Sequence, residues 1–148
     1  MNWRIFTVFP LAGLAACHEP PTLSVDHGYV RLGTMPSRPS AGYFTIHGGP
    51  TETTLIAVNS PVAVKSELHE SMTAGGMATM KPLGDLKIPA LSTTEFKPGG
   101  KHLMLFDMNP GIKPGRPITL TFTFSDGRRI DSLVPTIAPG APAPTFKD

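Results

Sequence analysis

Two histidines and two methionines stand at fixed separations in the middle of the chain. Ten residues separate His69 from Met80, twenty-one separate Met80 from His102, and one separates His102 from Met104. Imidazole nitrogen and thioether sulfur are neutral ligands that suit monovalent copper, whereas carboxylate and carbonyl oxygens suit magnesium, calcium and manganese. Because the pattern contains no carboxylate, it indicates a Cu(I) site rather than a site for a hard cation or a catalytic zinc.

Methionine is concentrated in the same region. The chain has seven methionines, and five of them lie between residues 72 and 108: Met72, Met77, Met80, Met104 and Met108. A single methionine usually fills an irregular gap in a core, which is our interpretation of Met108. Core packing does not explain two methionines paired with two histidines. Residues i and i+2 of a strand face the same side, roughly 7 Å apart at Cα, so His102 and Met104 can share one metal ion.

Met77 is a further thioether near the pattern. Met77 and Met80 are three residues apart, so a regular strand points them to opposite faces. Only one of the two joins the site easily, unless Gly75 and Gly76 leave Met77 in a loop. We therefore keep Met77 as an alternative or auxiliary ligand.

The first sixteen residues read as a targeting segment. Arg4 supplies its positive charge, and the apolar run over residues 5–14 is too short for a membrane span of about 20 residues. Leu14-Ala15-Ala16-Cys17 resembles the bacterial lipobox, in which cleavage precedes the cysteine and the thiol is acylated. Cys17 is the only cysteine and lies where the cleavage site belongs, which favours lipidation over an ordinary signal peptide. Residues 17–26 would then be the lipidated cysteine and its tether.

Acylation of Cys17 leaves the mature chain without a thiol, and this excludes several classes of copper protein. Blue-copper electron-transfer sites need a cysteine thiolate. Cys-x-x-Cys metallochaperones and thiol oxidoreductases need two cysteines. Imidazole and thioether are less easily oxidised than thiolate, so the proposed ligands suit an oxidising compartment outside the cytoplasm.

The chain between the two ends is long enough for one domain, over residues 27–135. The proline- and alanine-rich residues 136–148 predict an extended, disordered tail. The charges nearly balance, with 13 basic and 11 acidic residues, and they are scattered. Nothing in this distribution suggests a surface for nucleic acid.

The central region predicts strands throughout. Short runs rich in Val, Ile, Thr, Tyr and Phe alternate with turn residues, and seventeen prolines argue against helices. The expected strands are His27–Leu32, Gly42–His47, Thr53–Val58, Ala63–Glu70, Ala78–Leu83, Thr93–Phe96, His102–Met108, Ile118–Phe124 and Arg129–Val134. Eight or nine short strands at this spacing predict an all-β fold, either a sandwich or a small Greek-key barrel.

The expected strands also suggest which way the ligands point. Val62, Val64 and Leu68 alternate and should face the core, which leaves His69 on the polar face with its odd-numbered neighbours or at the strand end. A turn at residues 98–100 places His102 at the start of its strand. Both observations favour a metal site near the surface.

With His69-x10-Met80-x21-His102-x-Met104 in place, the chain resembles the periplasmic copper chaperones of the PCuAC type, whose signature is H-x10-M-x21-H-x-M. The resemblance covers roughly residues 27–135. The supporting segments are Tyr29-Val30-Arg31, Ala41-Gly42-Tyr43-Phe44, Glu67-Leu68-His69-Glu70, Met80-Lys81-Pro82 and Lys97-Pro98-Gly99-Gly100-Lys101-His102-Leu103-Met104-Leu105.

The resemblance implies a single cupredoxin-like β-sandwich domain. We also expect no enzymatic activity, because nothing in the sequence resembles a nucleophile–base pair or a carboxylate dyad. The resemblance implies that His69, Met80, His102 and Met104 bind Cu(I). It also implies a periplasmic carrier, in a bacterium of the Gram-negative type, that supplies the copper-bearing subunit of cytochrome c oxidase alongside Sco-type proteins. The chain departs from the family in two respects. Glu70 stands where some members have a methionine, and the lipobox, which is not part of the signature, implies a membrane-anchored version.

Three other interpretations remain open. The same site could sequester copper for resistance without a dedicated acceptor. If cleavage followed Cys17, His18 would become the N-terminal residue and could chelate copper in a copper enzyme. A β-sandwich lipoprotein that binds no metal and acts as a binding or assembly module is the third.

Overall fold

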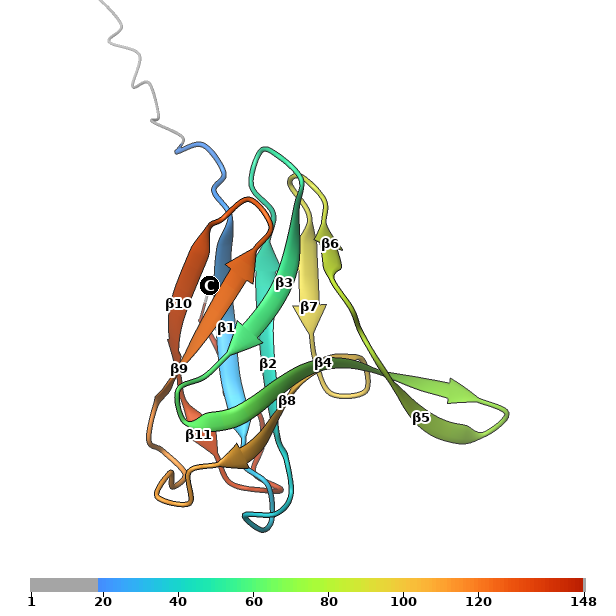
Figure 1. Ribbon diagram of the computed structural model, residues 1–148, viewed down its shortest axis with the longest axis vertical. Helices are drawn as coiled ribbons and strands as arrows, with labels where there is room; N and C mark the ends of the chain where they lie inside the picture. The colour runs from blue at the N-terminus through green and yellow to red at the C-terminus, as the bar shows by residue number, and fades with distance from the viewer. Residues whose placement is uncertain (1–18, 148) are drawn as a thin grey trace, which may run out of the picture.

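The computed structural model describes residues 19–147, which form two sheets of β-strands packed face to face (Figure 1). The targeting segment over residues 1–16, Cys17 and His18 lie outside the described residues. Within residues 19–147 there is no helix with the length and apolar character needed to cross a membrane. The all-β sandwich expected from the sequence is confirmed.

One sheet has the strand order β11-β1-β2-β8-β4-β5, with β7 paired to β2, and the other has the order β10-β9-β3-β6. The strands are β1 Ser24–Arg31, β2 Ser40–His47, β3 Thr53–Asn59, β4 Ala63–Ala74, β5 Met77–Pro82, β6 Leu86–Ile88, β7 Thr93–Phe96, β8 Lys101–Met108, β9 Ile118–Phe124, β10 Arg129–Val134 and β11 Thr136–Ile137. Figure 1 shows that β4 and β5 run on together beyond the sandwich as a projecting hairpin.

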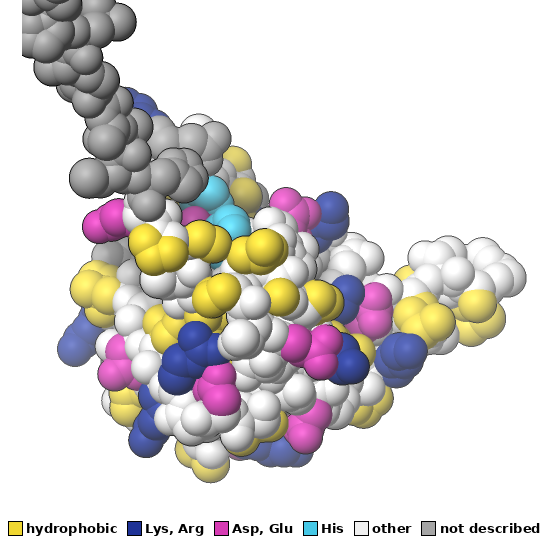
Figure 2. Space-filling view, turned by 90° about the horizontal axis from the view of Figure 1, so that it is seen from above, with side chains coloured by type: hydrophobic (Ala, Val, Ile, Leu, Met, Phe, Trp, Pro, Cys, Tyr) yellow, Lys and Arg dark blue, Asp and Glu magenta, His cyan; other side chains and the backbone are white. Residues whose placement is uncertain are grey.

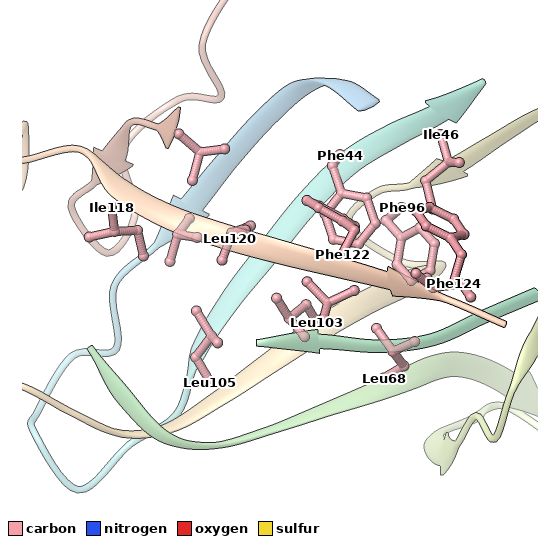
Figure 3. Close-up of a cluster of buried hydrophobic side chains, with 14 of the residues drawn as sticks. Phe44, Ile46, Leu68, Phe96, Leu103, Leu105, Ile118, Leu120, Phe122 and Phe124 are labelled. Carbon is pink, nitrogen blue, oxygen red and sulfur yellow. The ribbon is translucent and has the colours of Figure 1, made fainter. Parts of the chain in front are cut away.

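The core is made by the alternating apolar residues of both sheets (Figure 3). In β9, the buried positions are the four apolar ones and the threonines between them are half-buried, as the sequence alternation predicts. Phe44 of β2 stacks on Phe96 of β7 at a centroid distance of 4.3 Å and meets Phe122 of β9 edge-on at 4.7 Å. Full burial of each such side chain stabilises the fold by about 1.5–3 kcal/mol.

Core packing determines which face of β4 and β8 points outward. Leu68 of β4 pairs with Leu103 of β8, and both side chains are buried between the sheets. Because successive strand residues point to opposite faces, His69 and His102 must lie on the outer face of this sheet. The sequence interpretation that placed His69 on the polar face agrees with the structure.

Residues 136–148 were expected to form a disordered tail, and this prediction is wrong for three parts of the segment: β11, Ala141 and, as described below, Phe146. Thr136 and Ile137 form β11, which pairs in parallel with Val30 and Arg31 of β1. The Arg31 guanidinium donates a hydrogen bond to the Ala141 carbonyl. The composition of this segment discourages a core of its own, but it does not prevent pairing with the exposed edge of a formed sheet.

The same tail also contributes an aromatic contact. The Phe146 ring packs against the rings of His27 and Tyr29, at centroid distances of 4.9 and 6.4 Å. At the other end, the domain begins before residue 27. β1 starts at Ser24, and Leu23 is already part of the core, so the expected tether is shorter than residues 17–26.

Candidate metal site

The strand register brings the four predicted ligands to one face of the sheet. His69 of β4 pairs directly with His102 of β8. Met104 of β8 pairs with Glu67, two residues before His69, and Met80 of β5 pairs with Ser71, two residues after it. Directly paired residues, and residues two apart on a strand, share a face. All four side chains therefore lie on the outer face.

Exposure increases from the middle of this row to its end. His102 is only 6% exposed, the His69 side chain is 14% exposed, and Met104 is half-buried. Met80 lies on the projecting hairpin and is 57% exposed. Since Met80 is diagonal to His69 across β4 and β5, their Cα atoms are about 7–8 Å apart, within reach of a long side chain. The site thus has two enclosed imidazoles and one open side.

The two imidazole rings leave different nitrogens available. The Nδ1–H of His102 donates a hydrogen bond to the Gly100 carbonyl at 3.0 Å, which leaves the Nε2 lone pair for a metal. The Nε2–H of His69 donates to the Glu67 carboxylate at 3.0 Å, because an ionised carboxylate can only accept. This tautomer leaves a lone pair on Nδ1 of His69. Metal-binding histidines commonly donate their other N–H in this way.

Nδ1 of His69 is buried and has no hydrogen-bond partner among the described residues. Leaving such an atom unpaired costs about 1–3 kcal/mol of folding free energy. A metal ion at this position would satisfy it. The two rings lie on neighbouring strands of one face, with 6.1 Å between their centroids and 30° between their planes. The donor set therefore fits a soft ion.

Glu67 orients His69 and is itself held by Lys65. The hydrogen bond from the Lys65 ammonium, followed by the one from His69, lowers the pKa of the Glu67 carboxyl below its ordinary value. Glu67 thus stays ionised and keeps accepting from the imidazole. The Lys65 ammonium also lies over the Phe106 ring, 5.3 Å from its centroid. This supporting role was not predicted from the sequence, although Glu67 stands two residues before His69 on the same strand face.

No group of three or more His, Cys, Asp or Glu side chains within residues 19–147 is arranged to hold a metal ion. The candidate site is completed only by the two thioethers, which are poor ligands for hard cations. Its composition therefore favours Cu(I) over zinc, calcium or magnesium.

Met77 is not brought to this face. Gly75 and Gly76 form the two-residue turn between β4 and β5, with φ of 58° and 78°, the conformation that such hairpin turns require. Met77 is the first residue of β5, paired with Ala74, rather than part of a loop. Its side chain consequently points to the face opposite Met80.

A family model described as "Putative lipoprotein LpqE-like" matches residues 23–136. The chain belongs to the LpqE-like family. Among curated proteins, "Putative lipoprotein Lxx21020" of Leifsonia xyli subsp. xyli (strain CTCB07) is 35% identical over 82 residues, which is 55% of this chain and 49% of that protein. The match thus spans about half the length of that relative.

Solved structures resemble the LpqE-like chain over most of its length. The copper-bound PCuAC domain from PmoF2 superposes with a TM-score of 0.66 at 18% identity, covering 82% of this chain and 97% of that one. The CuI-DR1885 solution structure from Deinococcus radiodurans gives a TM-score of 0.61 at 25% identity, covering 83% and 81%. The cupredoxin-like fold expected from the resemblance to PCuAC-type proteins is therefore confirmed.

Proposed function

We propose that this LpqE-like chain is an extracytoplasmic Cu(I) metallochaperone whose cargo is held by His69, Met80, His102 and Met104. The observation that carries the proposal is the direct pairing of His69 with His102. In each ring one nitrogen makes a hydrogen bond and the other has a lone pair available for a metal ion. Two structural neighbours carry copper, as a copper-bound PCuAC domain and as CuI-DR1885, which supports the choice of ion.

The open side of the site suits transfer rather than permanent storage. An acceptor can approach Met80 on the exposed hairpin while the imidazoles remain enclosed. By resemblance, we propose the copper-bearing subunit of cytochrome c oxidase or a Sco-type protein as the acceptor. The similarity to lipoproteins supports attachment of the chain to the outer side of a bacterial membrane, through Cys17.

Anaerobic titration with Cu(I) in the presence of a competing chelator tests the proposal. The soluble domain should bind one Cu(I) tightly and zinc weakly, because two thioethers disfavour the harder ion. Equal affinities for zinc and Cu(I) would overturn it. Mixing the copper-loaded domain with an apo oxidase domain then separates delivery from sequestration, since a sequestering protein keeps its ion.

A further inference from the structure

The projecting hairpin carries two more thioethers, on the face that the candidate site does not use. Met77 is 70% exposed and Met72 is 44% exposed. In the register of β4 and β5, Met72 pairs with Thr79 and Met77 pairs with Ala74. Met72 and Met77 are therefore diagonal neighbours on one face. Figure 2 shows the hairpin standing out from the rest of the surface with hydrophobic side chains along it.

The two sulfur atoms can reach a common ion. Diagonal neighbours on adjacent antiparallel strands are about 7–8 Å apart, close enough for long side chains to interact. Metal–sulfur bonds are near 2.3 Å in thiolate zinc sites, so two sulfurs sharing one ion lie within roughly 4–5 Å. Methionine has three rotatable bonds and both side chains are exposed, so the two sulfur atoms can approach each other without displacing core groups.

The surroundings select a soft ion. Residues 71–80 contain no charged side chain, and Glu70, the carboxylate two residues before Met72 on the same face of β4, is paired with the Lys101 ammonium at 3.7 Å. The oxygen ligands that calcium or magnesium requires are therefore not gathered around the two methionines. The turn is fixed by Gly75 and Gly76 in the left-handed region of φ, which keeps the two methionines in register. The hairpin buries neither Met72 nor Met77, so packing does not account for their presence.

We propose that Met72 and Met77 form a second, weaker Cu(I) site at the end of the hairpin, on the face opposite His69 and Met80. It is a two-thioether contact point at which an incoming or outgoing ion is held before it reaches the partner or the enclosed site. The proposal rests on the proposed function for the identity of the ion, but it uses different residues.

Methyl NMR of the protein with ¹³C-labelled methionine methyl groups tests it, because Cu(I) is diamagnetic. In an anaerobic titration with Cu(I), the signals of Met80 and Met104 should shift with the first equivalent. The signals of Met72 and Met77 should shift together with the second. Leucine conserves the volume and apolar character of methionine but has no sulfur. The double variant Met72→Leu/Met77→Leu should therefore still bind the first equivalent of Cu(I) and no longer bind the second.

Met35→Leu is the matched control, because Met35 is an exposed single thioether, at 52%, away from the hairpin. This variant should still bind both equivalents. Shifts of Met80 and Met104 with none at Met72 and Met77 would overturn the second site and leave the proposed function standing. Shifts confined to Met72 and Met77 would leave the hairpin site standing and overturn the proposed ligands of the first site. Binding of a second equivalent that survives the double substitution would also overturn the inference.

Discussion

His69 and His102 face each other across β4 and β8 and are fixed through opposite nitrogens. The Nε2–H of His69 is held by a carboxylate and the Nδ1–H of His102 by a backbone carbonyl. Each bond selects the tautomer of its ring and so determines which lone pair is free. The ring orientations are therefore set before any ion arrives, which reduces the cost of organising the site on binding.

The thioether of Met104 should matter for copper binding and that of Met108 should not. Met104 shares the face of His102, whereas Met108 packs at the edge of the core. Met104→Leu should weaken Cu(I) binding at least tenfold, or about 1.4 kcal/mol, while Met108→Leu, an equal change in volume, should have little effect. Chelator competition measures both. If the two variants behave alike, the ligand assignment is wrong.

Removing Glu67 should weaken copper binding although Glu67 does not contact the ion. Loss of a group that orients a metal-bound histidine typically costs about 10–100-fold in metal affinity. Glu67→Ala should therefore lower Cu(I) affinity within this range and leave the number of ions bound unchanged. Glu70→Ala is the control, because Glu70 is next to His69 on the opposite face and pairs with Lys101 at 3.7 Å. Equal losses in both variants would point to a nonspecific charge effect.

The stability of the folded protein at low pH should depend on Asp126, which lies in the turn between β9 and β10. Hydrogen bonds from the Arg128 side chain and then its backbone amide lower the pKa of Asp126 from 3.8 to about 2. Since the folded-state pKa is depressed, the stabilisation is fully present above pH 3.8 and is lost as pH falls through about 2. Asp126→Asn should lower the free energy of unfolding at neutral pH, and the difference from wild type should shrink toward about pH 2. Denaturant unfolding at several pH values measures it, and a difference independent of pH would contradict the assignment.

Cys17→Ser should release the protein from the membrane fraction without changing its affinity for Cu(I). Only five residues separate Cys17 from Leu23, which is already buried in the core. An extended chain covers at most about 3.3–3.6 Å per residue, so a lipid at Cys17 would hold the domain within roughly 20 Å of the bilayer. Confinement raises the effective concentration of acceptors on the same membrane. Oxidase activity at low copper should therefore fall in cells carrying the variant; normal activity after release would show that the anchor does not assist delivery.

The sequence predicted nine of the eleven strands in the described residues, the sandwich and the polar face of His69, because alternation and turn residues are local signals. It missed the two shortest strands, β6 and β11, which are too short to show alternation. It did not predict how far the second sheet extends. Val64 was expected to face the core and is instead 82% exposed, since alternation identifies a face but not what covers it. The direct pairing of His69 with His102 is likewise a non-local fact. It depends on β4 meeting β8, which the spacing of the residues does not determine.

The short strand β11 has a consequence for any recombinant version of this domain. Val30 N–H donates to the Pro135 carbonyl and Leu32 N–H donates to the Ile137 carbonyl, so residues 135–137 occupy the edge of β1 that does not pair with β2. A boundary placed at residue 135 on composition alone would strip that edge. An uncovered strand edge is a template for pairing with another molecule. Proteins truncated there should therefore associate as their concentration rises, while a chain that keeps β11 remains protected.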